Sequence, residues 1–119
     1  MLETMVEFAD KFSDLVRDHA KWSQSTFGDD SAIGPLGALR HLEKEARECQ
    51  DAVGTPMLRE ELADCLLLLL DASRRANVKP MELVEAAQEK MVRNKQRIWP
   101  KPVPGEPCEH VRESDKGGA

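Results

Sequence analysis

Cysteine is scarce in this sequence and shows no pairing pattern. The chain holds three cysteines, Cys49, Cys65 and Cys108, an odd number without a CxxC pair. The cysteines therefore show no pattern of a disulfide framework or a zinc knuckle. This favours a reduced, cytoplasmic setting. We expect Cys49 and Cys65 to be small core residues and Cys108 to be a thiol of the tail.

Long apolar runs and an excess of positive charge are also missing. The longest apolar run is the row of leucines Leu66–Leu70, which is far shorter than the roughly 20 residues of a membrane span. The acidic start has no basic region followed by an apolar core, so it is not a secretory signal. With 17 basic and 22 acidic residues the net charge is −5, which argues against nucleic acid or an anionic membrane as partner. We expect a cytoplasmic protein, placed in the bacterial host cytoplasm if a phage encodes it.

The sequence lacks the patterns of β-strands, and its apolar residues recur at helical spacing instead. Alternation is missing and β-branched residues are sparse, whereas glycine and proline divide the chain into four apolar-striped segments. The sequence therefore predicts an all-α domain over residues 1–99 with four helices, at about 2–21, 35–53, 57–76 and 80–98. Thr55, before Pro56, is expected to cap the start of the third helix, and Asn77 is expected to cap its end. The four prolines after residue 99 forbid further helix, so residues 100–119 are expected to be an extended tail that either wraps the domain or is disordered beyond Glu113.

The segment at 57–76 is apolar on nearly all sides because Leu66–Leu70 follow one another. A helix of that kind is buried on nearly all sides. In so small a domain this indicates burial against a second subunit, and we expect a homodimer or homotetramer.

Two pairs of acidic residues flank the apolar stripes of consecutive helices. Glu45 and Glu48 are three residues apart, as are Glu61 and Asp64, so each pair shares a helix face. Asp71 lies seven residues beyond Asp64 on the same side. Four such acids would repel one another without a cation, and hard divalent ions take oxygen ligands. Two pairs beside the core therefore predict a metal site, although a single pair would more often be a solvated face.

These acids form an ExxE…ExxD signature. Through it the sequence resembles the MazG-like all-α nucleoside triphosphate pyrophosphohydrolases. Further motifs make the sequence similar to one branch of these enzymes, the dATP/dGTP diphosphohydrolase-like domains. Within that branch, a phage enzyme of the MazZ type is a candidate for a closer resemblance. The further motifs are Trp22 with Phe27-Gly28, Gly34-Pro35-Leu36 before His41-Leu42, Asp71-Ala72 with Arg75-Ala76, Lys90, Asn94 and Arg97 with Trp99-Pro100, and Glu109-His110-Val111-Arg112.

The resemblance implies a metal-dependent mechanism. Glu45, Glu48, Glu61 and Asp64 would hold Mg²⁺ or Mn²⁺, and an activated water would attack the α-phosphorus and release pyrophosphate. Glu48, with Glu45 beside it, is our choice for the catalytic carboxylate that orients or deprotonates this water. Asp71 would be an additional ligand or would support the ligands through hydrogen bonds.

Basic and aromatic residues supply candidate substrate contacts. Lys90, Asn94 and Arg97 recur at i, i+4 and i+7, which suits a polyphosphate; with the resemblance we prefer this to a solvated basic helix end. Trp22, and with less support Phe27, would stack on the base, although such residues pack in cores as often. We expect His41 to be packed or capping, not a metal ligand.

The expected activity is metal-dependent hydrolysis of a (deoxy)nucleoside triphosphate, dGTP or dATP by resemblance, to the monophosphate and pyrophosphate. Two alternatives remain open. One is a phosphoribosyl-ATP pyrophosphohydrolase, which shares the acid motif. The other is a non-catalytic helical dimer that binds a partner protein through its leucine face.

Overall fold

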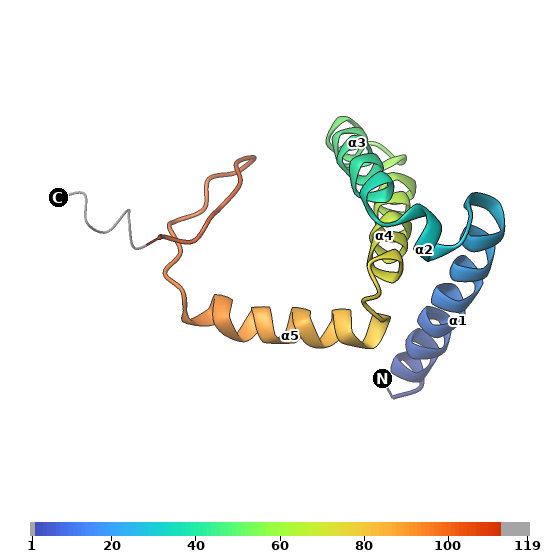
Figure 1. Ribbon diagram of the computed structural model, residues 1–119. Coiled ribbons are helices and arrows are strands. Elements are labelled where there is room, and N and C mark those ends of the chain that lie inside the picture. The colour runs from blue at the N-terminus through green and yellow to red at the C-terminus, as the bar shows by residue number, and fades with distance from the viewer. Residues whose placement is uncertain (1, 113–119) are drawn as a thin grey trace. The chain divides into compact units, whose positions relative to one another are not determined.

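The computed structural model describes residues 2–112, and all regular structure in that range is helical. The helices are α1 (Leu2–Phe27), α2 (Asp30–Ile33), α3 (Leu36–Ala52), α4 (Leu58–Arg75) and α5 (Pro80–Gln96) (Figure 1). The predicted all-α class is therefore confirmed. Within residues 2–112, no helix combines the length and hydropathy that crossing a bilayer would require.

The expectation of four helices was wrong by one short helix. The backbone N–H groups of Ala32 and Ile33 both donate to the Asp29 carbonyl, and Gly34 donates to Asp30, which closes the single turn of α2 inside the expected break. α1 also runs on to Phe27, six residues past its expected end, and stops where Gly28 takes a φ of +116°. That left-handed conformation ends a helix at low cost only for glycine.

Side-chain hydrogen bonds and backbone caps set the boundaries of α4. Thr55 was expected to cap this helix, but α4 begins at Leu58. Thr55 Oγ1 instead donates to the Ala52 carbonyl at 2.7 Å and accepts the Met57 N–H at 3.2 Å, so it shapes the turn between α3 and α4. At the other end Asn77 has a φ of +62°, and the Val78 N–H donates to the Ser73 carbonyl. This is a Schellman cap with asparagine at the left-handed position, as expected.

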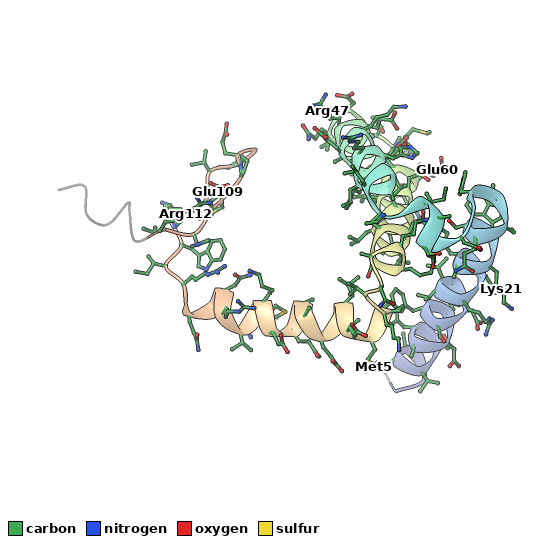
Figure 2. The ribbon with its side chains drawn as sticks, in the orientation of Figure 1. Met5, Lys21, Arg47, Glu60, Glu109 and Arg112 are labelled. Atoms are coloured by element: carbon green, nitrogen blue, oxygen red, sulfur yellow. The ribbon has the colours of Figure 1, made fainter. Side chains whose placement is uncertain are left out.

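The chain forms two compact units, Met1–Leu83 and Val84–Ala119, which divide within α5. The first holds an antiparallel pair of helices, α3 and α4, with α1 and α2 against α4 (Figure 1). Arg47 of α3 and Glu60 of α4 are exposed at the surface of this pair (Figure 2). The expected functional division after residue 99 stays a prediction.

In the second unit the chain after α5 turns back on itself. The Val111 N–H donates to the Ile98 carbonyl at 2.7 Å, and the rings of Trp99 and His110 meet edge to face at 5.8 Å. Residues 100–112 contain no helix or strand, in agreement with the proline spacing. The disorder expected beyond Glu113 lies outside the described residues.

The apolar core of the described chain is small. Its buried apolar side chains are those of Ala52, Leu70 and Ala72. Cys49 and Cys65, expected in the core, are half-buried, with their sulfur atoms 3.5 Å apart between α3 and α4. Leu62, Leu66 and Leu69 form an exposed stripe on α4 at helical spacing.

Candidate active site

A cavity of about 410 Å³ lies in the first unit, and four helices contribute to its wall. Each long helix presents residues three or four positions apart, so that each lines the cavity with one face. The lining residues from α1, α2, α3 and α4 are His19, Trp22, Ser23, Phe27, Ile33, Gly34, Gly37, Ala38, His41, Glu45, Asp64, Leu67, Leu68, Asp71 and Arg75. The volume lies in the range of small-molecule sites.

Carboxylates from α3 and α4 converge at this cavity. Glu45, Glu61 and Asp64 each offer an oxygen atom, and these atoms all lie within 4.8 Å of one another. Glu45 is buried, Glu61 is half-buried and Asp64 is exposed, so the cluster runs from the helix seam to the surface. The spacing of three residues on α4 places Glu61 and Asp64 on the face that meets Glu45.

The proximity of these acids changes their proton affinities. The neighbouring Glu48 carboxylate lowers the pKa of Glu45, against the opposing effect of burial and with a further contribution from His41 and Glu61. The same contact with Glu45 raises the pKa of Glu48, and burial adds to the increase. Burial, followed by the neighbouring Glu45, raises the pKa of Glu61. A cation bound among these carboxylates would relieve their like-charge repulsion.

The residues present fit a hard divalent cation. Oε2 of Glu45 and Oε2 of Glu61 are buried and have no hydrogen-bond partner among the described residues. Buried polar atoms are nearly always satisfied, and Mg²⁺ and Mn²⁺ take carboxylate oxygens as ligands. Glu48 is not part of the three-residue group, but its carboxylate and that of Glu45 shift each other's pKa. The ligand set expected from the sequence is thus brought together at Glu45, Glu61 and Asp64, with Glu48 adjoining.

Aromatic side chains form another part of the cavity wall. The rings of Trp22 and Phe27, both from α1, meet edge to face with centroids 5.3 Å apart, and each side chain is more than half exposed. His19 approaches Trp22 at 6.2 Å. Both aromatic residues that the sequence indicated therefore line the same cavity as Glu45 and Asp64. Their contact with a base stays a prediction.

His41 is a cavity residue whose contact with Glu45 the sequence did not predict. Its Nε2 lies 3.0 Å from Oε1 of Glu45, one helical turn along α3. The side chain is 53% exposed and lines the cavity. The spacing of Gly37, His41 and Glu45 at i, i+4 and i+8 is the signal that could have found it, because such residues share a face.

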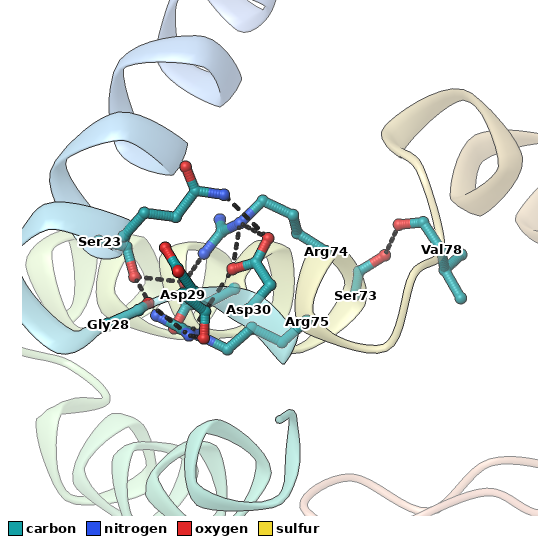
Figure 3. Close-up of polar contacts among 10 residues, drawn as sticks. Ser23, Gly28, Asp29, Asp30, Ser73, Arg74, Arg75 and Val78 are labelled. Atoms are coloured by element: carbon teal, nitrogen blue, oxygen red, sulfur yellow. Dashed lines mark hydrogen bonds and ion pairs between the residues drawn. The ribbon is translucent and has the colours of Figure 1, made fainter. Parts of the chain in front are cut away.

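Asp71 lies at the centre of an ion-pair network that joins α1, α2 and α4. Figure 3 shows its members Asp30, Arg74 and Arg75. Its carboxylate accepts hydrogen bonds from Ser23, Arg74 and Arg75, so both oxygens are engaged. Burial raises the pKa of Asp71, but these three donors outweigh it and the net shift is downward. Asp71 lines the cavity beside the acid cluster, but it is not among the three carboxylates that converge.

Arg75 ties the same network to the start of α2. It donates to Asp71 Oδ2 at 3.1 Å, to Ser23 Oγ at 2.9 Å and to the Gly28 carbonyl at 3.1 Å. Arg74 pairs with Asp30 at 3.0 Å (Figure 3). This network holds the carboxyl end of α1, which carries Trp22 and Phe27, against α4.

The three residues expected to bind phosphate belong to the second unit. Lys90 is exposed on α5, whereas Asn94 and Arg97 are half-buried. Arg97 lies one residue beyond the end of α5, and its Nη1 donates to Asn94 Oδ1 at 2.8 Å. The Asn94 carbonyl also accepts the Trp99 indole N–H at 2.7 Å. Asn94 and Arg97 therefore lie together, and their phosphate-binding role stays a prediction.

Comparison with known proteins identifies the family. Residues 15–117 match the family described as dATP/dGTP pyrophosphohydrolase. The chain is 44% identical over 97 residues to the Eaa protein of Salmonella phage P22, an alignment that covers 82% of this chain and 29% of that protein. The chain thus spans less than a third of that relative's length. No solved structure matches the chain significantly. On the strength of the family match, this chain belongs to the dATP/dGTP pyrophosphohydrolases, a phage-related branch of the MazG-like enzymes.

Proposed function

We propose that this protein hydrolyses a purine deoxynucleoside triphosphate, dATP or dGTP, to the monophosphate and pyrophosphate with the help of a divalent cation. The observation that carries the proposal is the convergence of Glu45, Glu61 and Asp64 beside a cavity that Glu45 and Asp64 line together with aromatic side chains. A nucleotide has an apolar, stackable base and an anionic polyphosphate. The cavity offers surfaces suited to both.

The residues of α3 that line the cavity indicate an orientation for the bound nucleotide. Gly37, His41 and Glu45 lie along one face of this helix, and eight residues of α-helix span about 12 Å. We place the base against Trp22 and Phe27 and the polyphosphate toward Glu45. Gly37 has no side chain that would narrow the cavity. The space beside it is open, because a Cβ built there would meet nothing within 4 Å.

The acid cluster would hold Mg²⁺ or Mn²⁺ through Glu45, Glu61 and Asp64. When bound, such an ion neutralises phosphate charge and lowers the pKa of a coordinated water. Glu48, whose pKa the adjoining Glu45 raises, is suited to exchange a proton with the attacking water. Water adds to the α-phosphorus, the bond to the bridging oxygen breaks, and pyrophosphate leaves. Lys90, Asn94 and Arg97 of the second unit are kept as proposed phosphate-binding residues, and within that unit Arg97 Nη1 donates to Asn94 Oδ1.

A product assay tests the proposal. The eight common nucleoside and deoxynucleoside triphosphates are incubated with the protein and Mg²⁺ or Mn²⁺, and pyrophosphate is distinguished from orthophosphate. We expect dGTP or dATP to yield pyrophosphate. Turnover of phosphoribosyl-ATP instead would identify the alternative enzyme. Absence of turnover, with no thermal shift from Mn²⁺ plus a nonhydrolysable deoxynucleotide, would favour the protein-binding module.

Substitution of Trp22 by alanine tests the base-binding end. Loss of the stacking surface should raise KM for dGTP or dATP by about 10- to 100-fold, since stacking on an aromatic residue contributes about 1–3 kcal/mol per base. The kcat should change much less, because Trp22 is remote from the reacting phosphorus in this orientation. Steady-state kinetics measure the two constants, with Phe8→Ala, an exposed residue of α1 outside the cavity, as matched control. An unchanged KM would remove Trp22 from the site.

We also propose that two or more copies associate through the leucine stripe of α4. Leu62, Leu66 and Leu69 are each at least 40% exposed, in a unit with very few buried apolar side chains. Exposed apolar stripes of this kind mark interaction surfaces. Sedimentation equilibrium should give at least twice the chain mass of 13.3 kDa, and the double substitution Leu66→Glu and Leu69→Glu should lower it to that of one chain. A wild-type protein that sediments as a monomer at micromolar concentration would contradict this proposal.

A further inference from the structure

We propose that His41 is a positioning residue for Glu45: its imidazole anchors one carboxylate oxygen so that the other is held ready for a cation. This inference rests on the proposed function. The two side chains lie one turn apart on α3, with Nε2 of His41 3.0 Å from Oε1 of Glu45. An ionised carboxylate accepts only, so the proposed anchoring requires the hydrogen on Nε2 of His41.

The two oxygens of Glu45 have different surroundings. Oε1 is engaged by His41, whereas Oε2 is buried without a hydrogen-bond partner in the described part of the chain. Glu45 also belongs to the group of three carboxylates whose oxygens lie within 4.8 Å of one another. Fixing Oε1 restricts rotation of the carboxylate and keeps Oε2 buried beside its neighbours. Hydrogen bonds of this kind to a ligating side chain are known to tune metal affinity.

A second pair on the same helix shows that this contact is not an ordinary surface ion pair. Arg47 and Glu43 have the same spacing of four residues, but they lie 3.5 Å apart and both side chains are more than 70% exposed. In the His41 pair the acidic partner is only 11% exposed. A contact to a buried carboxylate is screened less by water than an exposed pair. His41 reaches Glu45 from the cavity, which it lines.

The test compares His41→Leu with His41→Gln, because the Gln amide nitrogen can occupy the position of Nε2 and donate to Glu45. Mn²⁺ binding is measured by calorimetry without nucleotide, and kcat and KM are measured with dGTP or dATP. We expect His41→Leu to weaken Mn²⁺ binding by about 10- to 100-fold and to lower kcat. His41→Gln should stay within a few-fold of wild type. Arg47→Leu, which removes the matched surface pair, should leave both readouts unchanged.

The outcomes separate this inference from the proposed function. If the wild type binds Mn²⁺ and hydrolyses the nucleotide while His41→Leu matches it in both, the positioning role is refuted and the function stands. Equal impairment of His41→Gln and His41→Leu, with unchanged melting temperatures, also refutes it, because the donor would not matter. A wild type that neither binds Mn²⁺ nor hydrolyses any triphosphate overturns the proposed function and this inference together.

Discussion

Substitution of Glu61 by glutamine should lower kcat by about 10²- to 10⁴-fold, the range expected for loss of a group that acts in the transition state. Glu61 offers one of the three oxygens that converge between α3 and α4, and its Oε2 is buried without a hydrogen-bond partner among the described residues. Glutamine keeps the size of the side chain but removes its charge. Steady-state turnover of dGTP or dATP in Mg²⁺ or Mn²⁺ measures the loss.

The same substitution should leave the folded protein at least as stable at pH 7 without metal. Burial and Glu45 raise the pKa of Glu61 in the folded state, so ionisation of this group disfavours folding. The resulting loss of stability sets in as the pH rises through the unfolded value of about 4.3. Glutamine cannot ionise and avoids it. A melting temperature at or above that of wild type, with activity lost, is the expected combination.

Glu60→Gln is the matched control. Glu60 is the adjacent residue of α4, is exposed, and lies outside the acid cluster. The Glu60→Gln variant should keep nearly normal turnover, because the same negative charge is lost at the exposed surface and not in the acid cluster. Glu48→Gln should resemble Glu61→Gln if Glu48 exchanges the proton of the attacking water. Near-normal kcat in Glu61→Gln would show that the cluster does not serve the reaction.

Replacement of Arg75 by methionine should lower the free energy of unfolding by about 3–5 kcal/mol, because removing one partner leaves a buried ion pair uncompensated. The Arg75 side chain is 2% exposed and contacts Asp71, Ser23 and the Gly28 carbonyl. Methionine fills much of the space without donating to any of them. Chemical denaturation should report the loss, and the melting temperature should fall by roughly 10–20 °C.

Arg47→Met provides the stability control, because the exposed pair of Arg47 with Glu43 should contribute less than about 1 kcal/mol. Asp71 adds a pH signature. Its folded pKa is lowered by its donors, so its contribution is present above the unfolded value of about 3.9 and is lost as the pH falls through the folded pKa. Loss of Arg75 should move that acid-sensitive range upward. Equal stability of Arg75→Met and wild type would show that the network does not hold α1 against α4.

Several features could be predicted because they depend on neighbours in sequence. Helix spacing placed Glu61 and Asp64 on one face, and Asn77 ends α4 in the left-handed conformation that its position suggested. The short helix α2 escaped prediction, because its four residues carry no periodic apolar pattern. The end of α1 was placed too early for a similar reason, since its last turn has mixed polarity.

The surroundings of Asp71 depended on contacts across space, whereas the contact of His41 with Glu45 is local to α3 and only its place at the cavity required the tertiary structure. His41 was expected to pack or cap, yet it hydrogen-bonds to Glu45 at the cavity. Asp71 shared the helix side of Asp64, but Ser23 of α1 and Arg75 of α4 engage its carboxylate. A partner 48 residues away leaves no trace in local spacing, and so its presence could not be inferred from the pattern around Asp71.

By itself the sequence determined the helical class, the family and the two acid pairs, because helix periodicity and motif spacing are local properties of the chain. Only the tertiary structure decided that Glu45, Glu61 and Asp64 meet and that Trp22 and Phe27 line the same cavity. It also decided which acid is neutralised by arginines. The reason is that side-chain convergence depends on how α1, α3 and α4 pack, and packing is set by contacts between residues far apart in the chain.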